Sequence, residues 1–471
     1  MSNVKKSNTG NKVIKAGIWY TFSNFLLRGV GFLTTPLFTR VLSKSEYGDF
    51  NNFTSWMSLL MILTTLDLYT SINRARFDFE DDIDGYISSI AVLGTLFTAI
   101  CYLVVITFSD FFISLFSMEY KYIHIMFIYL LVSPVMTLLQ TKHRLYQEYK
   151  FFVFISIFST LISVGLSVIF VLTFSDKLFG RIVGYVAPLL IINIIIYLYI
   201  TFKGRKISLY YWRYGLFICV PLIPHVLGGN ILGTSDRLLI QKICGANDLA
   251  LYSLAYSCSL IVSVLWTSMN QAWAPWLMEN LHQKNYKVIK KRSKQYLFLF
   301  LSIGTSIILL APEVVYILGG KVYLQAKYVM PPVIMGCMFQ FAYSMYVNIE
   351  IYEKKTWLIS LGTMLAAVAN ILLNMLLIPI FGYIAAAYTT LICYALLLVF
   401  HFLSVKRLRL DICYDNRFIF AILTLELFMM VIITYLYSNN IIRYVVTGVY
   451  ITTLMVCALG YKKTVIALLK K

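Results

Sequence analysis

Fourteen long apolar segments constrain this chain more than any other feature of its sequence. A helix of about 20 apolar residues crosses a hydrocarbon core about 30 Å thick, and these segments have about that length. They lack the alternation of apolar and polar residues that a membrane β-barrel requires. Only 13% of the residues are charged, about half the share typical of a soluble protein. We therefore expect an all-α polytopic membrane protein with about fourteen transmembrane helices, at residues 17–39, 50–72, 86–108, 123–140, 151–174, 179–202, 214–240, 249–272, 296–318, 328–349, 357–378, 383–403, 418–437 and 440–460.

The basic residues are distributed unequally between the loops. With the N-terminus in the cytoplasm, the cytoplasmic loops and tails hold 29 of the 40 Lys and Arg residues and the external loops hold 9, while Arg28 and Arg237 fall within spans. This excess follows the positive-inside rule and predicts that both termini are cytoplasmic. The net charge of +19 therefore indicates orientation in the membrane and contact with membrane lipids, not with nucleic acid. The acidic cluster at residues 78–84 is expected to be a solvated loop.

The chain contains an internal repeat at a fixed offset of 202 residues. Phe179-Gly180 aligns with Phe381-Gly382, and Glu148 aligns with Glu350. A unit of six helices is even in number, so the two copies have the same orientation in the membrane, and rocking of one copy against the other permits alternating access. The predicted parts are a cytoplasmic tail (1–15), two parallel six-helix lobes around a central cavity (16–202 and 213–405), two extra helices (416–461) and a basic cytoplasmic tail (462–471).

The first apolar segment contains an arginine near its middle. Arg28 lies eleven residues from the start of the segment, about 16 Å deep in the membrane. Because a cation at this depth is costly in lipid, we expect it to face a wet interior, with Asn24 and Thr35 on the same helical face. The alternative is a buried arginine that only binds neighbouring helices.

The repeat predicts a second set of binding residues on the seventh helix. The offset carries Arg28 onto Asn230 and Thr35 onto Arg237, so each lobe is expected to direct one arginine towards the cavity. Pro221 and Pro224 favour kinks near the start of this helix.

Other polar residues in or near the spans are candidates for binding or energy coupling. Arg74, Asn370 and Asn374 are further substrate-binding candidates, while Asp67, Asp236 and Glu426 are coupling candidates. Four of these residues have a structural alternative. Arg74 can anchor the end of its helix, the two asparagines can form hydrogen bonds between helices, and Asp236 can form an ion pair.

Motifs of enzymes and cofactor sites are missing from the sequence. It contains no phosphate-binding G-x-x-x-x-G-K-[ST] loop, no H-E-x-x-H and no G-x-S-x-G. The eight cysteines form no C-x-x-C pair. We therefore expect a protein that is not an enzyme and that holds no cofactor, metal or disulfide.

Three stretches resemble bacterial polysaccharide (O-antigen-type) flippases of the multidrug/oligosaccharidyl-lipid/polysaccharide exporter superfamily. The first stretch resembles the opening signature of the family, the second its second-lobe opening, and the third its eleventh and twelfth helices. They are Gly29-Val30-Gly31-Phe32 with Pro36-Leu37-Phe38-Thr39-Arg40-Val41-Leu42 and Glu46-Tyr47-Gly48; Thr234-Ser235-Asp236-Arg237 with Leu251-Tyr252-Ser253-Leu254-Ala255-Tyr256; and Ala369-Asn370-Ile371-Leu372-Leu373-Asn374 with Ile378-Pro379-Ile380-Phe381-Gly382 and Ala385-Ala386-Ala387.

The resemblance implies a flippase that moves an undecaprenyl-diphosphate-linked oligosaccharide across the bacterial cytoplasmic membrane, with a polysaccharide polymerase complex as a further partner. Arginine suits the diphosphate because its planar fork matches phosphate oxygens. Two alternatives remain open, which are a cation-coupled drug antiporter of the same superfamily and a lipid II flippase. Arg28 matches a cavity arginine of lipid II flippases, but the second arginine expected six residues later is Thr34 here, which leaves Arg237 as the candidate second cation.

Overall fold

Helices make up nearly all of the computed structural model, which describes residues 29–146 and 148–460. Each predicted apolar segment is helical over most of its described residues, and no strand occurs in them. Eight helices in this part of the chain are long and apolar enough to cross a membrane, or up to eleven when each of three bent pairs is one span. The prediction of an all-α polytopic membrane protein is thereby confirmed.

The described chain divides into two compact units, and the first contains most of the N-terminal half. Unit 1 runs up to Ser253 and also includes Ile371–Tyr383. Its first helix covers residues 29–41. The following elements are α2 (Lys44–Thr65), η1 (Leu68–Ser71), α3 (Ile72–Asp78), η2 (Glu80–Asp82), α4 (Ile83–Thr107), α5 (Ser109–Phe116), α6 (Tyr120–Val132), α7 (Pro134–Leu145), α8 (Tyr149–Thr173), α9 (Lys177–Gly204), α10 (Leu209–Cys219), η3 (Val220–Leu222), α11 (Ile223–Cys244) and the start of α12 (Ala246–His282).

Unit 2 comprises Leu254–Asn370 and the chain from Ile384 onward. It contains the rest of α12, then α13 (Tyr286–Leu309), α14 (Ala311–Gly319), η4 (Lys321–Tyr328), α15 (Met330–Tyr352), α16 (Thr356–Phe381) as far as Asn370, α17 (Ile384–Arg407), η5 (Asp411–Cys413), α18 (Asn416–Leu436) and α19 (Asn440–Gly460). The predicted lobe boundaries stay a prediction, because these units are defined by packing alone.

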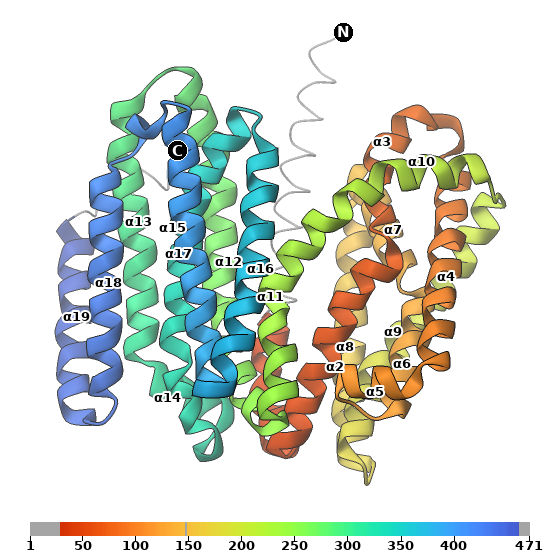
Figure 1. The fold of residues 1–471 in the computed structure, drawn as a ribbon, viewed down its shortest axis with the longest axis horizontal. Coiled ribbons are helices and arrows are strands. Elements are labelled where there is room, and N and C mark those ends of the chain that lie inside the picture. The colour runs from red at the N-terminus through yellow and green to blue at the C-terminus, as the bar shows by residue number, and fades with distance from the viewer. Residues whose placement is uncertain (1–28, 147, 461–471) are drawn as a thin grey trace. The chain divides into compact units, whose positions relative to one another are not determined.

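Close helix packing in unit 1 depends on small residues. α9 packs along α8 and also meets α4 and α6 (Figure 1). A Cβ atom added at Gly180 would lie 2.6 Å from the Phe170 carbonyl oxygen, and one at Gly184 would lie 2.4 Å from Ser167 Cα. Only glycine permits this approach, which is the usual role of small residues between membrane helices.

Several spans are interrupted, and proline accounts for most of the breaks. α10 and α11 meet at a bend of 54°, near Pro221 and Pro224, and α7 begins at Pro134. Proline has no N–H to donate to the preceding turn, so it favours the first turn of a helix over its interior. α2 and the η1–α3 segment bend by 49° without a proline, where Leu66 and Asp67 have φ of 50° and 51°.

The acidic cluster at residues 78–84 is solvated in part, as the sequence predicted, because Asp78, Glu80 and Asp81 are exposed, but its backbone is mostly helical and two of its carboxylates are paired. Asp82 accepts hydrogen bonds from Tyr211 Oη and from Lys206 Nζ, the latter at 2.5 Å, and Asp84 pairs with Lys142. Trp212 Nε1 donates to the Ser89 carbonyl oxygen at 2.8 Å. The bonds from Tyr211 and Trp212 join α10 to η2 and the start of α4, and the Asp84–Lys142 pair joins α4 to α7. The sequence did not predict these pairs because the basic and aromatic partners are distant in sequence.

Candidate functional site

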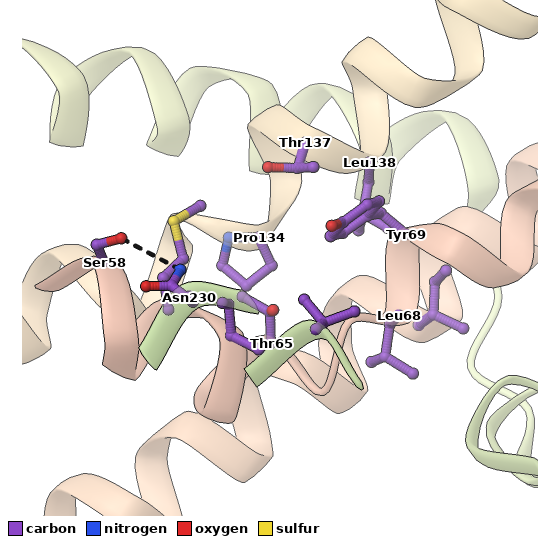
Figure 2. A pocket seen from close by; sticks show the side chains of 12 residues that line it. Ser58, Thr65, Leu68, Tyr69, Pro134, Thr137, Leu138 and Asn230 are labelled. Carbon is purple, nitrogen blue, oxygen red and sulfur yellow. Dashed lines mark hydrogen bonds between the residues drawn. The ribbon is translucent and has the colours of Figure 1, made fainter. Parts of the chain in front are cut away.

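A cavity of about 400 Å³ lies in unit 1, beside the breaks of two bent spans and the start of α7. α2 and η1 line one side, α7 a second side and α11 a third, and Ile90 of α4 completes the wall (Figure 2). This volume falls within the range of about 300–1,000 Å³ that is typical of ligand pockets. The lining residues are Ser58, Met61, Ile62, Thr65, Leu68, Tyr69, Ile90, Pro134, Thr137, Leu138, Val226 and Asn230.

The break after α2 supplies both irregular backbone and a buried carboxyl group beside this cavity. Leu66 and Asp67 have left-handed backbone angles, a conformation that costs a non-glycine residue about 1–2 kcal/mol. Asp67 is 2% exposed, and its Oδ2 accepts a hydrogen bond from Thr70 Oγ1 at 2.6 Å. At membrane depth, irregular backbone is tolerated where it is enclosed by protein or lines a cavity. Strain of this kind is often retained at functional sites.

Asn230 connects α11 with α2 across one end of the cavity. Its Nδ2 donates to Ser58 Oγ at 3.4 Å, and its Oδ1 accepts a hydrogen bond from Thr234 Oγ1 at 3.2 Å (Figure 2). Thr65 and Pro134 face the same space in this view. The interrupted spans thus direct a small set of polar groups into the cavity.

The polar groups in the cavity wall are all neutral. Ser58, Thr65, Tyr69 and Thr137 contribute hydroxyl groups and Asn230 contributes an amide, while the other seven lining residues are apolar. Hydroxyls and amides both donate and accept hydrogen bonds, so they complement a ligand that is rich in hydroxyl groups. A diphosphate would require cations, and none of the twelve lining residues is charged.

Of the three residues predicted on the first helix, only Thr35 lies within the described part of the chain. Asn24 and Arg28 lie outside the described residues. Thr35 is buried, and its Oγ1 donates to the Gly31 carbonyl oxygen at 3.0 Å. Arg74 has an exposed side chain whose Nε donates to Asp78 Oδ2 at 3.1 Å, so it is paired at the end of α3 and does not line the cavity.

Asp236 on α11 is held by two neutral donors within unit 1. It is 2% exposed, and it accepts hydrogen bonds from Tyr252 Oη at 2.5 Å and from Asn374 Nδ2 at 2.6 Å. Asn374 is fully buried by this contact. Arg237 is half-buried on the same helix and does not line the cavity.

The two predicted residues in unit 2 also contact other helices. Asn370 is fully buried and donates to Thr390 Oγ1 at 3.0 Å. Glu426 on α18 accepts a hydrogen bond from Thr305 Oγ1 at 2.6 Å. Of the predicted set, the cavity in unit 1 therefore includes Asn230 in its wall and Asp67 beside it, and the binding and coupling roles of all these residues stay predictions.

Sequence reasoning missed the cavity itself. Pro134 and the two prolines near α11 indicated breaks, but Leu66 and Asp67 carry no such signal. Sequence reasoning also missed Arg181, whose charge was counted with the external loops. The structure places Arg181 inside α9, and the residue is 9% exposed. Its position after Phe179-Gly180, within an apolar segment, was the available signal.

Comparisons with known proteins agree with this fold. A solved lipid II flippase, described as "MurJ, inward closed conformation", matches with a TM-score of 0.73 and 14% identity over 95% of this chain and 100% of the other. An inward-facing multidrug resistance MATE family transporter of the MOP superfamily matches with a TM-score of 0.56 and 14% identity over 84% of this chain and 98% of the other. The described helices therefore have the fold of these two solved transporters.

The family follows from the sequence match. Residues 13–281, more than half of the chain, match the family model described as "Polysaccharide biosynthesis protein". This chain belongs to that family. "Lsg locus putative protein 1" of Haemophilus influenzae is a relative with 23% identity over 379 residues, which cover 76% of this chain and 89% of the relative. The predicted resemblance to polysaccharide flippases of the superfamily is thereby confirmed.

Proposed function

We propose that this protein is a flippase that translocates undecaprenyl-diphosphate-linked oligosaccharide repeat units across the bacterial cytoplasmic membrane for polysaccharide synthesis. Membership of the polysaccharide biosynthesis family supports the class of substrate. The observation that carries the proposal is the cavity of about 400 Å³ with a neutral hydroxyl and amide lining, formed by α7 and by two membrane spans that are bent at a break. A soluble headgroup rich in hydroxyls fits such a lining, and interrupted helices are a recurrent way to build transporter sites.

In this proposal the substrate is divided chemically among different parts of the protein. The sugar occupies the neutral cavity, where Asn230 and the neighbouring hydroxyls exchange their present hydrogen bonds for those of the sugar. The diphosphate is bound by Arg28 and Arg237, an assignment that rests on the sequence repeat. The polyprenyl tail stays in the lipid.

Asp67, Asp236 and Glu426 remain the candidates for coupling transport to an ion gradient or to the membrane potential. A polysaccharide polymerase complex is a further proposed partner. The neutral lining favours the sugar substrate over a cationic drug, because a drug cation would call for a carboxylate in the cavity wall.

Transport by the purified full-length protein in proteoliposomes tests the proposal. A fluorescent undecaprenyl-diphosphate-linked oligosaccharide is placed in both leaflets, and a membrane-impermeant glycosidase digests the sugar that reaches the outer leaflet. We expect digestion to pass the half-way limit only when the protein is present. Digestion that stops at half with a folded protein would contradict the proposal.

A cavity-filling variant links this transport to the cavity. Thr137→Leu places a larger apolar side chain in the wall, and we expect it to lower the rate at least tenfold. Thr107→Leu is the matched control, because Thr107 is exposed and does not line the cavity. An equal effect of both substitutions would remove the cavity from the mechanism.

A further inference from the structure

Arg181 is a buried cation in contact with two aromatic rings. It lies in α9, and its Cζ atom is 3.5 Å from the centroid of the Phe38 ring and 4.1 Å from that of the Phe50 ring. Only 9% of the residue is exposed. Two rings at these distances occupy much of the space around the planar guanidinium group, and its N–H groups reach hydrogen-bond partners in its own plane.

Two edge atoms of this guanidinium group have no partner. Nε and Nη1 are buried and make no hydrogen bond to any described residue. A buried donor without an acceptor is costly, and a buried charge without a counter-ion costs more. Contacts with two aromatic rings offset only part of that cost. Such a group is unusual enough in a folded protein to require an explanation.

The carboxylates nearest in sequence to Arg181 and Phe50 have other partners. Asp176 caps α9 by accepting a hydrogen bond from the Phe179 backbone N–H at 2.9 Å, and it pairs with Lys121 at 3.0 Å. Burial works to raise the pKa of Asp176, but these two bonds bring it below the ordinary value for aspartate. Asp49 accepts a hydrogen bond from Gln241 Nε2 at 2.9 Å. Arg181 thus lacks a counter-ion among the described residues.

The backbone that carries Arg181 is firmly packed. Gly180 and Gly184 bring α9 against α8, as described above, and Ser167 Oγ donates to the Arg181 carbonyl oxygen at 3.4 Å. Arg181 is four residues from the start of α9, about 6 Å along the helix. The predicted span begins at residue 179, so Arg181 lies near the end of that span, close to the expected headgroup region.

We propose that Arg181 is a binding site for a phosphoryl anion at the end of α9. The anion supplies the acceptor oxygens that Nε and Nη1 lack and the charge that balances the guanidinium group. Such a phosphoryl group occurs in the headgroup of an anionic phospholipid and in the diphosphate of a lipid-linked substrate. The site is independent of the neutral cavity and does not rest on the proposed transport function.

Thermal unfolding of the purified full-length protein in a phosphate-free detergent tests this site. Inorganic pyrophosphate is the probe, and potassium chloride at equal ionic strength is the reference. We expect pyrophosphate to raise the Tm of the wild type saturably. Arg181→Gln should abolish the rise, and Arg181→Lys should weaken the apparent affinity about tenfold, because lysine keeps the charge but loses the planar fork.

Lys177→Gln is the matched control, because Lys177 is an exposed cation one turn away on the same helix. It should respond as the wild type does. If Arg181 only packs against the aromatic rings, pyrophosphate will raise the Tm of the wild type no more than chloride does. That result would overturn the proposal. An undiminished rise in Arg181→Gln would overturn it as well.

Competition identifies the source of the phosphoryl group. Loss of the pyrophosphate response after addition of phosphatidylglycerol supports a phospholipid headgroup as the ligand. Loss only after addition of a short-chain polyprenyl diphosphate supports the lipid-linked substrate. A response that neither lipid reduces would overturn the assignment to a lipid phosphoryl group.

Discussion

Buried polar residues in the spans of this protein fall into two kinds. Some are satisfied by other helices, as Asp236 is by Tyr252 and Asn374 and as Asn370 is by Thr390. The structural interpretation of these residues is that their hydrogen bonds stabilise helix packing, which is common between membrane helices. In others the polar atoms line a cavity, as in Asn230, or have no hydrogen-bond partner, as Nε and Nη1 of Arg181 do. The second kind is the better guide to ligands, because those atoms retain hydrogen-bonding capacity.

Asn374→Leu tests the structural role of the Asp236 contact. The substitution removes the Asn374 hydrogen bond from a buried carboxyl group, so we expect a loss of about 1–3 kcal/mol in the free energy of unfolding. Thermal unfolding in detergent measures it. If Asp236 also couples transport to an ion, Asp236→Asn will slow transport more than its change in Tm explains. Equal losses of transport and folded protein would leave Asp236 a structural residue.

Arg28→Ala is the residue-scale test of diphosphate binding. A charged hydrogen bond contributes about 1–3 kcal/mol, so the loss of one should lower export about 5- to 150-fold. Arg28→Lys should restore part of the rate, because lysine keeps the charge without the fork. Polymer export and protein abundance are measured together. Normal export by Arg28→Ala at normal abundance would refute the role, and a lysine that fails equally would favour the structural alternative.

At the scale of whole elements, the sequence predicted where helices occur better than where they break. Apolar length identified the spans because each needs about 20 residues. Pro221 and Pro224 revealed the bend before α11, because proline blocks a hydrogen bond locally. The break at Leu66 and Asp67 was hidden, because neither residue type marks it and the surrounding packing maintains it. The cavity is formed by several elements that are distant in sequence, so no single sequence segment could predict it.

The start of α18 offers an element-scale prediction with a pH dependence. Asp415 caps this helix by accepting a hydrogen bond from Phe418 N–H, and it pairs with Lys294 Nζ at 2.7 Å. The bond from Lys294 holds the pKa of Asp415 below its usual range. Asp415→Ala should lower the free energy of unfolding by about 0.5–2 kcal/mol through loss of the cap. Asp415→Asn should cost less, because asparagine keeps the cap and loses only a partly exposed ion pair.

The sign of the pH effect follows from the lowered pKa. A carboxyl group whose pKa is lower in the folded state stabilises the protein fully above its unfolded pKa of about 3.9, and this contribution is lost as the pH falls through the folded pKa. The difference in Tm between the wild type and Asp415→Asn should therefore be constant near neutral pH and disappear in acid. A difference that grows as the pH falls would contradict this account.

At the scale of the whole molecule, the remaining prediction is the orientation of the chain in the membrane. This prediction rests on the count of basic residues in the loops, and the structure changes that count. Arg181 and Arg443 were counted with the external loops, but they are buried within α9 and α19. Arg443 Nη1 donates to Glu313 Oε2 at 2.6 Å within unit 2, so its charge is paired there. Without these two, the excess of basic residues in the predicted cytoplasmic loops is larger.

Single cysteines placed in a variant that lacks the eight native cysteines test this orientation. Ser45→Cys lies on an exposed position in the first turn of α2 and spares Ser43, whose side chain caps that helix. Lys290→Cys lies on an exposed position of α13. A membrane-impermeant maleimide should label position 45 in intact cells and position 290 only after permeabilisation, because the basic stretch around Lys290 is predicted to be cytoplasmic. Labelling of position 290 in intact cells would reverse the orientation and would place the Arg181 end of α9 at the cytoplasmic face.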